Sequence, residues 1–353
     1  MQNETNSDND MKRILSFTCV LALVGLTVSC SKENVADPTP AFVDEVSYRI
    51  ITTDEAKQYF MHEKLHEQIT PYFMDMALQK DSATREEWLD LTLRSMHGPM
   101  ASRQAFLDSI ATVQTGALRS MGISLPLPKQ IDVIDMTMDA FGGATAFTSG
   151  TRIYADIPVI LNAQASDPSV AERLMWHELW HVISRNNPDL RKQMFSLIGF
   201  HVLPDEIEIP EEVKSHVLCN PDVERHDSYA TFTINGKATD CMLLLYAEED
   251  EYSFFTLASY ISTAKGYWLL ALDPVTHKPY RDEKGEWAIY NCKEATDFAT
   301  VMSGGNTLYC DDPEECMAEN FAFAMVNDTS RPNQKLLQDI REMMKQLTNR
   351  PAR

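Results

Sequence analysis

Residues 167–188 read DPSVAERLMWHELWHVISRNNP and contain the pattern H-E-x-x-H at His177, Glu178 and His181. An aspartate followed by a proline favours a helix N-terminus at the start of this stretch, and its closing Asn-Asn-Pro ends the helix. On such a helix the two histidines lie one turn apart, so both imidazoles can bind one cation. We therefore predict a helix that carries a metal site.

The glutamate of this pattern indicates a chemical use for the metal. Zinc accepts neutral imidazole ligands and, in catalytic sites, keeps one position open for water. Its charge lowers the pKa of that water to around 7, and the carboxylate of Glu178 can accept the proton as the hydroxide attacks a carbonyl group. The pattern is typical of a peptidase that hydrolyses peptide bonds with a Glu-activated, zinc-bound water.

A second H-E-x-x-H is present at His62, Glu63 and His66. The residues around this copy are largely charged or polar, which is typical of a solvated surface. The residues around His177 are apolar on nearly every side, as a buried helix requires, and a dry site strengthens the electrostatics of a metal. We therefore assign the metal to the His177 copy and interpret the His62 copy as an exposed helix face.

The N-terminal segment has the features of an export signal. A Lys-Arg pair follows Met11, and a mostly apolar run ends at Ser29-Cys30. The run is too short for a comfortable transmembrane span, so residues 11–30 are predicted to be a signal peptide. Its end, L-T-V-S-C, resembles the lipobox of bacterial lipoproteins, in which the cysteine is acylated. We expect a protein of the bacterial cell envelope, periplasmic or surface-facing, anchored in the membrane through Cys30 by a flexible tether over residues 31–44.

Composition agrees with a folded exported enzyme. Hydrophobic residues make up 44% of the 353 residues, which is enough for a sizeable core. The formal net charge of −21 argues against nucleic acid as a partner, since no stretch offers a basic phosphate-binding stripe. The five cysteines after Cys30 could form up to two disulfides, in a pairing that their spacing leaves open. No feature of the composition indicates an oligomeric state.

The order of elements predicts an α+β fold. Residues 45–128 form a helical N-terminal region, with helices expected at 54–78 (broken at Pro71), 83–96 and 102–120. Residues 129–353 form the catalytic domain, in which strands are expected at 130–138 and 150–161, a further helix at 191–200, and a hairpin that turns at Asn235-Gly236.

Residues 141–147, Phe-Gly-Gly-Ala-Thr-Ala-Phe, lie between the first two of these strands and allow two interpretations. They form either an ordinary hairpin or a sheet edge, at residues 144–147, to which a substrate peptide adds as a further strand. Pro158 favours an edge position for the second strand, since proline cannot donate a ladder hydrogen bond.

A second informative stretch, residues 309–325, reads YCDDPEECMAENFAFAM. The Asp-Asp-Pro within it starts a helix, on which Glu315 and Glu319 share one face. Two carboxylates on a partly buried face raise each other's pKa unless a cation lies nearby, and a metal with two histidine ligands would supply that cation. Glu314 and Asp312 fit a solvated acidic face.

The two stretches together resemble the catalytic domain of anthrax lethal factor and its relatives, zinc peptidases of the gluzincin type. The resemblance rests on HELWH followed by Y-x-x-x-P-x-E-x-x-A-E-x-F. It implies that Glu315 is the third zinc ligand, that Glu319 supports a ligand histidine, and that Tyr309 stabilises the oxyanion of the reaction. It also implies a zincin-like fold, with an insertion between residues 191 and 306.

We therefore expect a zinc metalloendopeptidase with an active-site helix and a small sheet. Its expected partners are a peptide or protein substrate and the membrane that holds the lipid anchor. Trp176 and Trp180 are expected to pack the helix rather than bind substrate. The alternative is a non-catalytic envelope binding lipoprotein that retains a metallopeptidase-like scaffold. An intact Glu178 argues against this alternative, because a scaffold has no need of a base.

Overall fold

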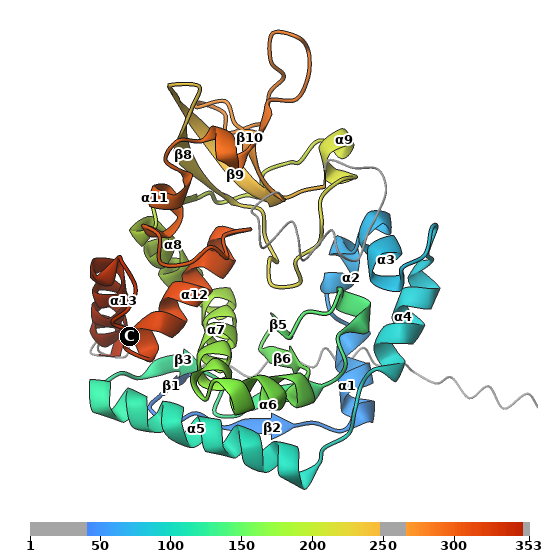
Figure 1. Cartoon of the computed structure of the whole chain (residues 1–353), viewed down its shortest axis with the longest axis vertical. Coiled ribbons are helices and arrows are strands. Elements are labelled where there is room, and N and C mark those ends of the chain that lie inside the picture. Colours follow the sequence, from blue (N-terminus) through green and yellow to red (C-terminus); the bar gives the residue numbers. More distant parts are fainter. Residues whose placement is uncertain (1–40, 248–265, 349–353) are drawn as a thin grey trace, which may run out of the picture. The chain divides into compact units, whose positions relative to one another are not determined.

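The helix predicted around the H-E-x-x-H motif is α7, Ser169–Asn186, in the computed structural model, which describes residues 41–247 and 266–348 (Figure 1). The helix begins one residue later than predicted, because Pro168 takes the N-cap position and no side chain caps it. Asp167 Oδ1 still accepts the backbone N–H of Ser169 at 3.0 Å, and Pro188 begins the next helix, as the sequence predicts. The helix is buried from Met175 to Ser184, so its apolar residues face protein on every side. The predicted signal peptide, its Cys30 and the first part of the tether lie outside the described residues.

The predicted helical region contains five helices. Threonine capping boxes start two of them, at Thr52 and Thr84, and Pro71 begins another rather than merely bending a longer helix. The five are α1 (Thr53–Phe60), α2 (Leu65–Gln68), α3 (Pro71–Leu78), α4 (Arg85–Arg94) and α5 (Ala101–Met121).

A four-stranded sheet lies against α7. Its strand order is β2-β4-β6-β5, and the first three strands are parallel, whereas β5 is antiparallel and forms an edge. The strands are β2 (Tyr48–Ile50), β4 (Ile131–Asp135), β6 (Arg152–Ala155) and β5 (Ala146–Ser149). The sheet takes β2 from the predicted helical region, so that region and the remaining chain share one core. Both interpretations of residues 141–147 hold in part, because β5 pairs with β6 as a hairpin and is also an edge.

The predicted strand over residues 150–161 is wrong in its second half. The strand β6 ends at Ala155, and Ile157–Ser166 form helix α6. Asp156 caps this helix by accepting the N–H of Val159 at 3.1 Å, and Pro158 lies in the first turn. A cap followed by proline starts a helix even where the residues have high strand propensity.

The end of the predicted tether is also structured. Strand β1 (Ala41–Val43) pairs antiparallel with β3 (Leu125–Leu127), because the sequence after the tether prolines already contains apolar residues that can add to an edge. All described residues belong to one compact unit. Within the described residues, no helix is long and apolar enough to cross a membrane.

The stretch of chain between α8 (Pro188–Leu197) and the last helices contains a five-stranded antiparallel sheet, which lies at the top of the view in Figure 1. The predicted hairpin is confirmed, with Asn235 and Gly236 both at positive φ between two of its strands. The sheet runs in the order β11 (Ile289–Asn291), β10 (Tyr267–Ala271), β9 (Lys237–Leu245), β8 (Ser228–Ile234) and β7 (His201–Val202). The short elements around it are η1 (Asp139–Phe141), α9 (Glu211–Lys214), η2 (Cys292–Glu294) and α11 (Phe298–Ser303).

The chain closes with α12 (Pro313–Met325) and α13 (Gln334–Thr348). Asp312 caps α12 by accepting the N–H of Glu314 at 2.8 Å, as the Asp-Asp-Pro sequence predicts. Helix α12 packs along α7, where Phe321 lies against the rings of Trp176 and Trp180, with ring centroids 6.2 and 5.6 Å away. Both tryptophans therefore pack the helix. The two stretches that carry the sequence motifs are neighbours in the core.

Candidate metal centre

The structure brings together His177, His181 and Glu315. Helix α7 places the two histidines one turn apart, and the first turn of α12 places Glu315 opposite them. Glu315 Oε2 lies 2.9 Å from His177 Nε2 and 3.8 Å from His181 Nε2. All three side chains are buried, and their ligand atoms lie within 4.8 Å of one another. This group could hold a metal ion.

Unsatisfied polar atoms support this interpretation. His181 Nε2 and Glu315 Oε2 are buried and have no hydrogen-bond partner of suitable geometry among the described residues. Buried polar atoms in proteins are almost always satisfied, and a cation between these atoms would satisfy both. Two imidazoles and a carboxylate form a donor set that zinc accepts in sites with an open position.

A carboxylate of α12 lies behind each histidine ring. Glu319 Oε1 lies 3.3 Å from Nδ1 of His177, and Glu314 Oε1 lies 3.4 Å from Nδ1 of His181. At His181 the carboxylate is a hydrogen-bond partner of Nδ1, which fixes the proton there and leaves Nε2 free to bind a metal, whereas Nδ1 of His177 has no partner of suitable geometry among the described residues.

The interpretation of Glu314 and Asp312 as a solvated acidic face is wrong. Glu314 is only 5% exposed and Asp312 only 6%. The sequence did not reveal this, because nothing in it shows that α8 and the C-terminal end of α7 cover this side of α12.

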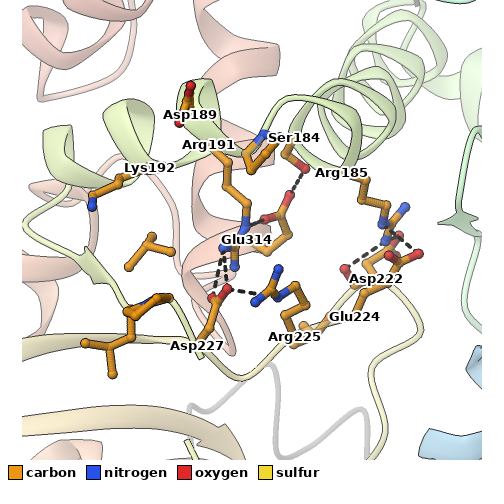
Figure 2. A pocket seen from close by; sticks show the side chains of 15 residues that line it. Ser184, Arg185, Asp189, Arg191, Lys192, Asp222, Glu224, Arg225, Asp227 and Glu314 are labelled. Atoms are coloured by element: carbon orange, nitrogen blue, oxygen red, sulfur yellow. Dashed lines mark hydrogen bonds and ion pairs between the residues drawn. The ribbon is translucent and has the colours of Figure 1, made fainter. Parts of the chain in front are cut away.

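Glu314 belongs to a buried ion network behind α7 (Figure 2). Arg191 Nε lies 3.0 Å from Glu314 Oε2, Arg191 Nη1 donates to Asp227 at 2.8 Å, and Ser184 donates a hydrogen bond to Glu314. Burial alone would raise the pKa of Glu314, but its contact with His181 and the charge of Arg191 lower it to about 2. The network lines a cavity of about 450 Å³ and keeps this carboxylate ionised beside a ligand histidine.

Glu178, the predicted base, is buried beside the ligands. The hydroxyl of Thr148 on β5 donates a hydrogen bond to Glu178 Oε2 at 2.7 Å and so orients the carboxylate. Burial and the nearby Asp222 carboxylate raise the pKa of Glu178 to about 7. A carboxylate with a pKa near neutrality is well matched to accepting and returning a proton.

Tyr309 lies beside His177, one of the three residues of the candidate metal centre. Its ring stacks on that of His177, with centroids 6.1 Å apart and planes at 22°. Burial and the Glu315 charge raise its pKa well above the usual value, so the phenol keeps its proton and can donate it in a hydrogen bond.

The sequence does not predict that Asp222 belongs to this site. This residue follows Asn220-Pro221, which by sequence indicates no more than a turn, in the loop before β8. Its Oδ1 lies 3.8 Å from His181 Nε2 and accepts the backbone N–H of Thr148 at 2.7 Å. In the same loop the amide of Asn220 donates to Glu315 Oε1 at 2.9 Å. The loop therefore contacts His181, Glu315 and the sheet edge together.

A cleft of about 350 Å³ opens in front of these groups. It is bounded by the loop and strand that lead into β5, by α7, and by side chains of the metal centre: residues 141–146, Leu174, His177, Glu178, Asp222, Tyr309 and Glu319.

The second H-E-x-x-H does not form a comparable site. His62 and Glu63 lie in the turn between α1 and α2, so the two histidines do not share a helix. Glu63 Oε2 accepts the hydroxyl of Ser149 at 2.8 Å, and His66 packs its ring against Trp88. The assignment of this copy as non-metal agrees with the structure, since the described residues contain no candidate metal group besides that of His177. The prediction of an exposed helix face is right in part: His62 is exposed but lies in a turn, whereas Glu63 and His66 are half-buried.

The five cysteines after Cys30 are all buried, and no disulfide joins them in the part of the chain that the structure describes. Comparison of the chain with models of protein families, with curated proteins and with solved structures gave no match.

Proposed function

We propose that this chain is a zinc-dependent peptidase with a zincin-like fold. The observation that carries the proposal is the buried group of His177, His181 and Glu315 with Glu178 beside it. Of these residues, His177 and Glu178 line the cleft. Glu178 follows a ligand histidine on α7, so any substrate that reaches the metal also reaches the base. Zinc, when bound there, would polarise a carbonyl group and make water acidic.

The protein groups divide the remaining tasks. Glu178 accepts a proton from the attacking water and returns it to the leaving amine, and Thr148 holds its carboxylate in place. Tyr309, a protonated phenol in the cleft, donates a hydrogen bond to the oxyanion. Glu314 and Glu319 keep the ligand rings oriented.

The edge strand β5 offers a way to hold a peptide. It lies beside α7 and borders the cleft at Ala146. An extended peptide that pairs with such an edge gains backbone hydrogen bonds whatever its side chains are. This favours a peptide over a small molecule as the substrate.

We also propose that the enzyme works in a bacterial cell envelope, held by a lipid on Cys30. This part of the proposal rests on the sequence of residues 11–30. Labelling with a radioactive fatty acid tests it, and Cys30→Ala should abolish the label.

The variant Glu178→Gln tests the enzymatic function. Glutamine keeps the shape of the side chain and removes the proton acceptor, so the variant should bind about one zinc per chain, fold as the wild type does and hydrolyse no peptide. Metal analysis and a peptide library read by mass spectrometry measure the two properties. If the zinc-loaded wild type is as inert as the variant, the chain is a binding lipoprotein and the peptidase proposal is wrong.

A further inference from the structure

The segment 220–224, Asn-Pro-Asp-Val-Glu, lies along the open edge of β5. Asp222 Oδ1 accepts the N–H of Thr148 at 2.7 Å, and Glu224 Oε1 accepts that of Gly150 at 3.1 Å. Arg185 of α7 holds the segment through ion pairs with both carboxylates, at 3.4 and 3.1 Å (Figure 2). The N–H of Thr148 lies on the outer edge of β5, where an added strand would use it, and Gly150 lies in the turn directly after β5. The C-terminal end of the edge is therefore closed.

The other end of the edge is open. The cleft follows residues 141–146, and Ala146 presents its N–H in the same direction as Thr148, two residues further on. Thr148 also bonds to Glu178, so the base lies at the boundary between the closed and the open part. A peptide in the cleft can thus extend from the reacting bond in one direction along β5, and the segment 220–224 blocks the opposite direction.

Two arguments show which end of a peptide faces the block. Antiparallel pairing is the more stable arrangement, and it places the amino end of an added peptide at the C-terminal end of β5. Charge gives the same answer independently. The described residues that line the cleft include Glu178, Asp222 and Glu319 and no lysine or arginine. An α-ammonium group forms a strong charge-assisted hydrogen bond with a carboxylate, whereas a peptide carboxylate would be repelled.

We infer that the cleft accepts peptides by their free amino end, and that Asp222 binds the α-ammonium group. Water then adds across a peptide bond close to that end. It releases a short amino-terminal product with a new carboxylate and the remaining chain with a new α-amine. The inference rests on the proposed function and narrows its substrate class from chains cut internally to chains trimmed at the amino end.

Paired peptides of one sequence, with a free or an acetylated α-amine, test the inference on the zinc-loaded protein. Acetylation removes a charged hydrogen bond, so kcat/KM should fall by roughly 10- to 100-fold. Amidation of the carboxyl end should change it little. The inactive Glu178→Gln variant allows a second readout, because calorimetry on it should show the same preference in Kd without any turnover.

The variant Asp222→Asn tests whether Asp222 causes the preference for a free α-amine. Asparagine still accepts the Thr148 N–H but has no charge, so the ratio between free and acetylated peptides should fall towards one with zinc content unchanged. Asp156→Asn is the matched control, since Asp156 is another buried carboxylate that accepts a backbone N–H, and its variant should keep the wild-type ratio.

The outcomes separate this inference from the proposed function. Acetylated peptides that are cut as fast as free ones, or long peptides cut internally, overturn the inference and leave the peptidase standing. A preference for free amines that survives in Asp222→Asn overturns the role of Asp222. Absence of hydrolysis for every peptide with zinc bound overturns the peptidase, and equal Kd values on Glu178→Gln then overturn the amino-end preference as well.

Discussion

Replacement of Glu314 is the sharpest test of how the candidate metal centre is built. By sequence this residue belongs to a solvated face, and its loss should hardly affect zinc. In the structure it lies 3.4 Å from Nδ1 of His181 and 3.0 Å from Nε of Arg191. Losing a residue that orients a metal ligand weakens metal affinity by roughly 10- to 100-fold. We expect Glu314→Gln near the lower value, because its amide oxygen still accepts a hydrogen bond, and Glu314→Ala near the upper one.

The same variants should also lower the stability of the metal-free protein. Removing one partner of a buried ion pair costs about 3–5 kcal/mol when the other charge is left alone. Arg191 keeps its second partner, Asp227, so we expect a smaller loss in free energy of unfolding, about 1–3 kcal/mol for Glu314→Ala.

A competition titration against a chromophoric chelator at pH 7 measures zinc affinity, and urea unfolding of the metal-free protein measures stability. Asp135→Asn is the matched control. Asp135 lies on the strand β4, is fully buried and forms an ion pair with Arg103. The variant should lower stability and leave zinc affinity unchanged. If Glu314→Ala binds zinc as tightly as the wild type, His181 does not depend on this carboxylate and the reasoning fails.

Three further predictions concern the metal and the acid stability of the fold. His177→Ala and His181→Ala should each weaken zinc binding by more than about 100-fold, whereas His62→Ala should match the wild type in the same titration; zinc lost from the His62 variant alone would reverse the assignment. Free zinc at about 100 times its Kd should raise the free energy of unfolding by about 2.7 kcal/mol, and a chelator should remove this gain. Burial would raise the pKa of Asp328, but hydrogen bonds from the neighbouring serine and from Arg331 lower it to about 2 from its usual 3.8. The stabilisation is therefore present above about pH 4 and disappears as the pH falls through 2, so Asp328→Asn should be less stable than the wild type at pH 6 and equal to it near pH 2; a constant difference across this range would contradict the assignment.

Much of the secondary structure could be predicted because local signals agree with the final packing. Prolines mark both ends of α7, an Asp-Pro pair marks the start of α12, and an Asn-Gly turn marks the β8–β9 hairpin. Where residue propensity and a capping signal disagree, the propensity predicted the wrong element. Val159 and Ile160 favour a strand, but Asp156 and Pro158 start a helix there, and the cap decides because it satisfies backbone groups that a strand at this position would leave open.

His177 and His181 could be placed together from the sequence because helical spacing alone brings them to one face, whereas Glu315 was indicated only by the resemblance of its motif. Asp222 could not be placed, since its position depends on a loop that returns to the edge of β5 from beyond α9. Its neighbours in sequence predict a turn correctly and reveal nothing about what the turn contacts. The positions of side chains on such loops depend on tertiary packing, and the periodicity of the sequence does not reveal them.

The burial of Glu314 could not be predicted from its position on the helix. Glu314 lies about 100° around α12 from Glu315, so on a half-exposed helix it would point away from the metal. Helix α12 is instead buried at every residue except Glu319, and Glu314 and Glu319 reach the two histidines from either side of Glu315. One helix therefore supplies the ligand glutamate and the carboxylates behind both ligand histidines. A metal bound between α7 and α12 would hold the two helices together. Its binding free energy would then add to the free energy with which the hydrophobic core stabilises the fold.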